Sequence, residues 1–242
     1  KKLEKKYKNV KVFLRKNLGV SSSLNYAAKK TKTNYFLHLS PDLKVDYKDI
    51  KVFFKHAKKI NDDFCALGPR FLKTKKKGHI QIDKKLKYGK IESIHGSYMF
   101  INKKRFDEIN GWDDKIFLYF EETDYSYRGK KLGLNSYQIN SIKTKTIDTT
   151  VKINNENEKR NWLNLLVWHF IWSKFYTNKK KFGFIFSFII FLPIIIRILF
   201  RLSLYSIFYD KKKLVKYKFR LSGLYNSIIG NKSYLRLKDI KN

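Results

Sequence analysis

An aromatic run followed by three carboxylates and a guanidinium lies between Phe117 and Arg128, with the sequence FLYFEETDYSYR. A helix beginning near Glu121 would place Asp124 and Arg128 on the same face as Glu121. Glu122 would point to one side of that face. A carboxylate held there could take a proton from a reacting hydroxyl. The residues could instead form a simple Asp124–Arg128 helix pair with first-turn acids, each worth roughly 0.3–1 kcal/mol.

A second carboxylate follows a predicted strand. The apolar residues YFLHL, 35–39, are bounded by Ser40, Pro41 and Asp42. Proline stops the strand and leaves Asp42 at its carboxyl end, which is where ligands bind in open α/β sheets. The alternative is an ordinary Pro-Asp turn.

Strands and helices that could position these carboxylates alternate along the first part of the chain. Apolar residues recur at helical spacing in 47–60, and the serines at 21–23 could cap a helix carrying Leu24, Ala27 and Ala28. The Lys-rich segment 70–90 reads as a hairpin or loop with solvated charges. This alternation predicts a largely parallel sheet. The remaining predicted elements are a β-rich run at 10–14, strands at 64–69 and 97–101, a short helix at 103–109 and a turn at 110–114.

Composition indicates a folded chain with anionic partners. The 242 residues are 43% hydrophobic, and 54 Lys+Arg against 20 Asp+Glu give a formal charge of +34. Such an excess points to a polyanion, an anionic membrane surface or nucleotide phosphates, although drift in nucleotide composition could also produce scattered lysines. The single cysteine, Cys65, excludes an internal disulfide framework.

Beyond residue 151 the composition changes. A helix with an aromatic stripe is predicted at 156–176, followed by three lysines and an apolar run at 182–196 that Pro193 interrupts and Arg197 and Arg201 close. The run is short for a membrane span, which needs about 20 apolar residues. An in-plane or re-entrant helix on an anionic cytoplasmic leaflet is therefore favoured over a buried core helix. The basic, aromatic residues 210–242 are expected on the same surface.

Three histidines have different settings. His38 lies inside a predicted strand and His169 on the Trp-rich helix, so both are expected to be core or interface residues with satisfied hydrogen bonds. His95 precedes Gly96 near the expected site and is an open candidate. None has a metal-binding spacing to its neighbours.

Five stretches, taken in order, resemble the family-2 glycosyltransferases of the rhamnosyltransferase-like branch. They are Asn17-x-Gly19 with Asn25, Ser40-Pro41-Asp42, Gly96-Ser97, Gly111-Trp112-Asp113-Asp114, and Glu121-Glu122-x-Asp124 with Arg128. The resemblance covers residues 10–140, and a weaker one continues through 168–176. It implies an α/β fold of the GT-A type, which is Rossmann-like and binds nucleotide-sugars.

The resemblance also implies roles for individual residues. Asp42 would contact a divalent cation, Mg²⁺ or Mn²⁺, and Glu122 aligns with the general base, with Glu121 as a substitute. Asp124 would orient the base. Acceptor and support roles fall to Asp113, Asp114, Arg128 and His95, and donor-binding roles to Asn17, Gly19, Asn25, Ser40 and Gly96.

The chain departs from the family pattern at three places. Glu122 replaces the usual Asp, and Ser40 replaces the first Asp of the metal motif. Residues 141–152 contain no histidine, so that only Asp148 could replace the metal-binding His of many relatives. The chain begins at Lys1 without Met, and a first strand–helix unit is expected upstream of it.

Together these features predict an inverting glycosyltransferase that moves a sugar from a UDP- or dTDP-sugar to a surface-glycan or lipid-linked acceptor. Residues 1–150 would form the GT-A domain and 151–242 a helical membrane-associated region with its apolar segment at 182–208, on the inner face of the cytoplasmic membrane. One alternative is a non-catalytic basic protein that binds nucleic acid or an anionic membrane, which explains neither the acidic cluster nor, for nucleic acid, the apolar run. Another is a non-catalytic membrane partner with the same fold.

Overall fold

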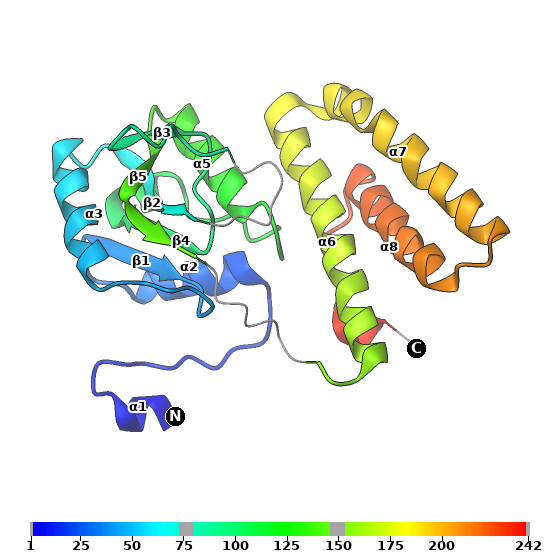
Figure 1. The fold of residues 1–242 in the computed structure, drawn as a ribbon, viewed down its shortest axis with the longest axis horizontal. Helices are drawn as coiled ribbons and strands as arrows, with labels where there is room; N and C mark the ends of the chain where they lie inside the picture. Colours follow the sequence, from blue (N-terminus) through cyan, green and yellow to red (C-terminus); the bar gives the residue numbers. More distant parts are fainter. Residues whose placement is uncertain (1, 73–79, 146–152, 241–242) are drawn as a thin grey trace.

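A computed structural model describes residues 2–72, 80–145 and 153–240. A sheet flanked by helices is followed by three long helices that lie to one side of it (Figure 1). The elements in chain order are α1 (Lys2–Lys6), α2 (Val20–Lys30), β1 (Tyr35–Leu39), α3 (Lys48–Lys59), β2 (Phe64–Phe71), β3 (Tyr88–Ile91), β4 (Tyr98–Asn102), α4 (Lys103–Glu108), α5 (Glu121–Lys131), β5 (Asn135–Thr144), α6 (Glu156–Phe182), α7 (Phe184–Ile207), α8 (Lys211–Ile228) and the 3₁₀ turn η1 (Leu237–Asp239).

The five-stranded sheet has the order β1-β4-β2-β5-β3. The prediction of a largely parallel sheet is wrong, because three of the four pairings are antiparallel and only β2 and β5 pair in parallel. Strands β1, β2 and β5 do run in one direction, as alternation with helices requires. Strand β4 inserts between β1 and β2 in the opposite direction, and β3 covers the outer edge of β5 in the same antiparallel way.

Helices cover both faces of the sheet. Side chains alternate along β4, so that Met99 and Ile101 pack with helices α2, α4 and α5, while Tyr98 and Phe100 pack with α3. Phe53 and Ala57 of α3 are fully buried, which confirms the amphipathic helix predicted there. The result is a mixed α/β core of two apolar layers with the sheet between them.

Several local predictions need correction. Residues 10–14 form no strand, and α2 begins after Gly19 without a side-chain cap, so the serines lie inside the helix. Pro193 does not interrupt α7. Phe191 before it and Ile198 after it are both buried against α6 and α8, and this packing holds the helix together across the missing hydrogen bond. The predicted segment 70–90 lies partly outside the described residues, and its Arg70 is not solvated, since it donates to the Ile82 carbonyl at 2.9 Å.

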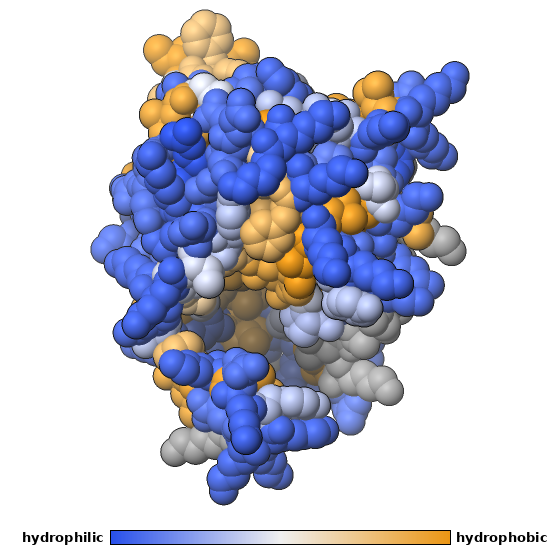
Figure 2. Space-filling view, turned by 90° about the vertical axis from the view of Figure 1, so that its left-hand side faces the viewer, coloured by the Kyte–Doolittle hydropathy of each residue, from blue (hydrophilic) through white to orange (hydrophobic). Residues whose placement is uncertain are grey.

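Helices α6, α7 and α8 pack around their own apolar cluster of Ile171, Phe175, Phe191, Ile198 and Leu224. Within the described ranges, α7 is the one helix long and apolar enough to cross a membrane. The opposite side of the molecule, where α3 lies, is mainly hydrophilic with a smaller apolar area near its middle (Figure 2). Exposed apolar side chains are concentrated on α7 and include Phe184, Ile185, Phe186, Ile189, Ile196, Leu199, Phe200 and Ile207.

Candidate active site

The carboxyl end of β1 meets the turn that precedes β4. Leu39 pairs with Tyr98 in the antiparallel ladder, and the Ser40 amide donates to the Ser97 carbonyl at 2.8 Å. Asp42 follows two residues later and is half-buried. Within the described residues its carboxylate has no hydrogen-bond or ion-pair partner. This edge therefore presents a carboxylate that is not committed to holding the fold.

Glu122 lies against Gly96 of the same turn. A Cβ atom built on Gly96 would be 3.4 Å from the Cβ, Cδ and Oε2 atoms of Glu122. A Cβ would therefore just reach van der Waals contact with Glu122, and a larger side chain at this position would collide with it. The predicted base and the predicted donor-binding glycine, distant in sequence, are in contact beside the end of β1.

His95 is held next to this contact. Its ring stacks on Phe71 with centroids 4.3 Å apart, and its Nδ1 lies 2.7 Å from the Ser97 hydroxyl. The histidine thus packs beneath the turn with at least one ring nitrogen engaged.

The chain enters the acidic helix through two residues in the left-handed region. Tyr119 and Phe120 have φ values of 69° and 68°, which is rare for residues with large side chains and marks a strained turn. Helix α5 then begins at Glu121, with all three acids in its first turn beside the positive helix end. Burial, followed by the charge of Glu121, raises the pKa of Tyr119.

Asp124 is buried and bound by two cations. Its side chain is 1% exposed; Arg128 Nε binds Oδ2 at 2.7 Å, and Lys180 from α6 binds Oδ1. Arg128 also donates to the carbonyls of Ile109 and, at 2.6 Å, Gly111. The pair predicted from helix spacing exists, and it ties α5 to the turn at 110–114.

Asn25 of α2 clamps that turn. Its side-chain amide donates to the Trp112 carbonyl and to Asp114, both at 2.8 Å, and its oxygen accepts from the Trp112 amide at 2.9 Å. Both amide protons and the carbonyl oxygen are thus used within the protein. Asn25 therefore positions the turn, and its contact with the donor, expected from the resemblance, stays a prediction.

Asp113 faces α6 instead of open solvent. It accepts from Tyr176 at 2.9 Å and from Lys180 at 2.7 Å. Burial alone would raise the pKa of Asp113, but the Lys180 ammonium and the Lys115 amide lower it overall.

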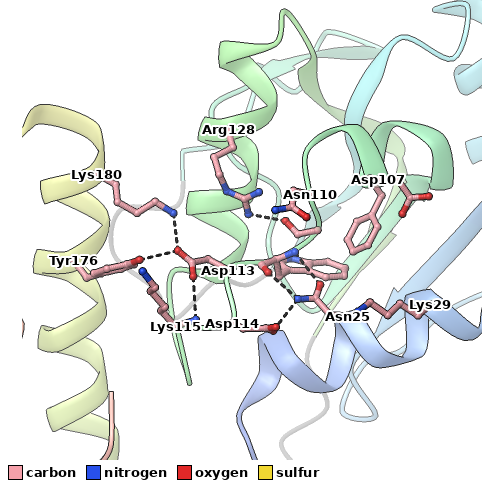
Figure 3. Close-up of a pocket in the computed structure, with 13 residues that line it drawn as sticks. Asn25, Lys29, Asp107, Asn110, Asp113, Asp114, Lys115, Arg128, Tyr176 and Lys180 are labelled. Atoms are coloured by element: carbon pink, nitrogen blue, oxygen red, sulfur yellow. Dashed lines mark hydrogen bonds and ion pairs between the residues drawn. The ribbon is translucent and has the colours of Figure 1, made fainter. Parts of the chain in front are cut away.

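A pocket of about 710 Å³ lies here between the turn, α2, α5 and α6 (Figure 3). Asp42, Gly96 and Glu122 are not among its described lining residues.

Gly19 and Asn17 position the start of α2. Gly19 has φ 104°, and a Cβ on it would be 2.7 Å from the Phe117 carbonyl oxygen. The Val20 amide donates to that same oxygen at 2.9 Å, and Asn17 accepts from the Gly19 amide at 3.2 Å. This close approach places the amino end of α2 against the segment that leads into α5.

The protein itself supplies few ligands for a metal. Within the described ranges no group of three or more His, Cys, Asp or Glu side chains could hold an ion. Asp148, the possible substitute for a histidine, lies outside those ranges. Asp42 fits the role of a single protein ligand, because its oxygens are uncommitted.

His38 and His169 are both buried. His169 Nε2 donates to the Leu235 carbonyl at 3.0 Å, and its Nδ1 lies 2.9 Å from the Ser233 hydroxyl, which confirms the predicted interface residue with satisfied hydrogen bonds. His38 differs from the prediction, because its Nδ1 has no partner among the described residues. Burial lowers the pKa of each to about 4, so both are neutral at pH 7.

Lys180 and Tyr176 were not predicted to contact the acidic segment. Sequence patterns placed Tyr176 in an aromatic packing stripe and Lys180 among lysines flanking an apolar run. Ser173 also reaches the segment, donating to the Leu118 carbonyl at 2.8 Å. No spacing rule links side chains so far apart in the chain, so only the packing of α6 reveals them.

Comparisons with known proteins identify the family of the chain. The family model described as glycosyl transferase family 2 matches residues 1–123. The low-salt glycan biosynthesis hexosyltransferase Agl10 of Haloferax volcanii is 22% identical over 156 residues, which is 54% of this chain and 49% of that protein. The chain thus spans about half the length of this curated relative.

Proposed function

Because this chain belongs to glycosyl transferase family 2, we propose that it transfers a sugar from a nucleoside-diphosphate-sugar to a surface-glycan or lipid-linked acceptor. The observation that carries the proposal is the contact of Glu122 with Gly96 beside the end of β1. It brings a carboxylate from the acidic helix to the edge of the sheet at which Asp42 also lies.

The proposed reaction is a single displacement with inversion. A Glu122 oxygen takes the proton from an acceptor hydroxyl while the acceptor oxygen forms a bond to the anomeric carbon of the sugar. The bond from the anomeric carbon to the diphosphate breaks, and its electron pair leaves with the nucleoside diphosphate. Asp124 and Arg128 keep α5 in place during this step, so that Glu122 stays over the turn.

A divalent cation, Mg²⁺ or Mn²⁺, would neutralise the departing diphosphate when bound. Asp42 would hold it from the protein side, and other ligands would come from the diphosphate and water. Asp42 also adds negative charge at this edge, so that a donor diphosphate would be repelled there in the absence of cations. The transferase is therefore expected to need a divalent ion.

The donors expected are UDP- or dTDP-sugars, with a hexose or deoxyhexose. The relative named a hexosyltransferase supports a hexose. We assign the transferase domain to residues 1–150 and a membrane-associated region to residues 151–242, bound to the inner face of the cytoplasmic membrane through α7. The exposed apolar side chains of α7 support this location, and a lipid-linked acceptor would be found there.

The test is release of nucleoside diphosphate from a panel of UDP- and dTDP-sugars. Protein expressed from its full natural reading frame is assayed with Mn²⁺, with Mg²⁺ and with EDTA. Asp42→Ala and Glu122→Gln are compared with wild type and with Glu158→Gln, a control that neutralises an exposed acid at the start of α6.

Metal-dependent release that both site variants abolish, and the control retains, is the expected result. Turnover unaffected by Glu122→Gln would overturn the assignment of the base. Absence of turnover and of donor binding in wild type would instead favour the non-catalytic partner with the same fold. Family membership, together with an acidic cluster that phosphate binding does not need, sets aside the nucleic-acid-binding alternative.

A further inference from the structure

The first observation is the outward face of α7. Only Ser187, Phe191 and Ile198 of this 24-residue helix are buried, and they form a single stripe toward α6 and α8. Elsewhere large apolar side chains point outward, with Ile185 71%, Ile196 64% and Ile207 70% exposed. Water does not favour such a surface, and a bilayer does. At 1.5 Å per residue the helix is about 36 Å long, so its length alone permits a span.

The second observation is the charge of α8, which runs back along α7 (Figure 1). The ring of Tyr217 in α8 lies 5.5 Å from that of Tyr205 in α7, and Leu224 packs on Ile198. Six cations occupy the first ten residues of α8, and α7 itself carries Arg197 and Arg201. Between residues 184 and 230 the sole acid is Asp210.

The positions of these charges favour one orientation of α7 relative to a bilayer over another. A helix crossing the bilayer would carry the packed half of α8 into hydrocarbon, where each Lys or Arg costs about 2.5–3.5 kcal/mol at the centre. A helix lying along the surface keeps all these cations at the level of the headgroups while its outward apolar face reaches the acyl chains. The cations of the α7–α8 hairpin therefore favour the second arrangement.

The third observation is how the cations are gathered. Arg201 donates to the Tyr205 hydroxyl at 2.9 Å, and Lys213 lies 5.3 Å from the Tyr205 ring centre. Arg220 lies 5.3 Å from the ring centre of Tyr217. We call these five residues the tyrosine–cation cluster. Asp210 neutralises one charge of the cluster through Lys213 at 2.9 Å, which leaves both guanidinium groups for an anion.

We propose that the tyrosine–cation cluster binds the phosphate groups of anionic phospholipids and that α7 lies in the plane of the bilayer surface. Arginine suits phosphate through paired N–H donors, and tyrosine favours the level between headgroups and acyl chains. This inference rests on the membrane association proposed above. It adds the lipid class, the residues that bind it and the orientation of the helix.

Binding is tested with vesicles of phosphatidylcholine alone and with phosphatidylglycerol added. Wild type is expected to prefer the anionic vesicles. The double variant Arg201→Gln/Arg220→Gln should weaken binding to them about 30-fold, because each basic residue near the surface contributes about 1 kcal/mol. The matched control, Lys51→Gln/Lys55→Gln on exposed positions of α3, removes the same charge and should change binding less than about threefold. Equal losses in both double variants, or none in the arginine variant, would overturn the lipid site.

Orientation is tested with single labels at three exposed positions that share one face of α7. Ile185→Cys, Ile196→Cys and Ile207→Cys each receive an environment-sensitive fluorophore, and quenchers at known lipid depths locate it. The native Cys65 is fully buried, and burial raises the pKa of its thiol to about 12, so it does not compete for the label. Equal depths are expected, whereas steps of about 16 Å between successive labels would show a crossing helix.

Folding and catalysis are followed separately in every variant. Circular dichroism checks helix content, and release of nucleoside diphosphate with a water-soluble acceptor checks the site. Loss of vesicle binding with retained turnover supports the lipid site, whereas wild type that binds anionic vesicles but shows no turnover and no donor binding contradicts the proposed transferase alone.

Discussion

Lys180 of α6 bridges Asp113 in the turn and Asp124 in α5, so a residue from the carboxyl-terminal helices completes the charge balance of the acidic helix. Asp124 is 1% exposed and Asp113 15% exposed, whereas Lys180 is 27% exposed. Burying two carboxylates is unfavourable without such cations. The acidic helix and α6 are therefore one structural unit.

Replacing Lys180 with Met should destabilise the protein by about 1–3 kcal/mol, less than the 3–5 kcal/mol typical of a broken buried pair, because Arg128 still binds Asp124. Urea unfolding followed by tryptophan fluorescence measures this. Lys179→Met, which removes an adjacent lysine whose side chain has no partner among the residues that the structure describes, should stay within about 0.5 kcal/mol. Lys180→Met should cost less in an Asp124→Asn background, and strict additivity would show that the pair contributes nothing.

Gly96→Val should lower kcat by about 100-fold with little loss of stability, because the new side chain displaces Glu122 from the turn. The matched control is Gly89→Val, where a Cβ would lie 3.4 Å from Ile82. Steady-state kinetics of nucleoside diphosphate release compares the two. Equal activity of both variants would contradict a catalytic position for Glu122.

Gly19→Ala should destabilise the protein by about 1–3 kcal/mol, since a left-handed φ and a clash with the Phe117 carbonyl both oppose it. Gly133→Ala separates the two causes, because Gly133 has φ 80° with nothing within 4 Å of a built Cβ. Unfolding free energies of the two variants are compared. The larger loss of stability is expected for Gly19→Ala. The difference between the two losses measures the clash of the new Cβ with the segment that leads into α5.

Stability should fall as pH is lowered from about 6.5 to about 4. Burial lowers the pKa of His38 and His169 to about 4, so the unfolded chain binds more protons than the folded one in this window. Moving from pH 7.5 to pH 5 should cost about 2 kcal/mol for each histidine. Chemical unfolding at both pH values tests this, and His169→Gln should remove about half of the dependence. An unchanged pH dependence in that variant would contradict the assignment.

The sequence predicted the elements of the fold better than their pairing. Apolar spacing identified α3, and short apolar runs identified β1, β2 and β4, because burial on one or two faces leaves a periodic pattern. The insertion of β4 between β1 and β2 was missed, since periodicity carries no information about a strand's neighbours. Pro193 was judged by its local preference, and packing on both sides of it outweighed that preference.

In the candidate site, too, the sequence identified individual residues better than the contacts between them. Resemblance selected Gly96 and Glu122, and the structure places them in contact. It also selected Asn25, whose amide holds the turn in the structure, and the donor contact expected of it stays a prediction. Lys180 was missed because its charge, read locally, belongs to a run of three lysines before an apolar segment. Contacts between distant parts of the chain depend on packing that no local pattern records.

Gly183 ends α6 and begins α7, with φ 80° and ψ 171°. Since α6 is fastened to the acidic helix and α7 would lie on lipid, the bend at Gly183, held by the apolar cluster that α6 and α7 share, would set the height of Glu122 above the membrane. At a fixed height, only acceptors whose spacer between lipid and terminal hydroxyl has a matching length would reach the base. Selection of the acceptor would then depend on molecular length as well as on the sugars recognised.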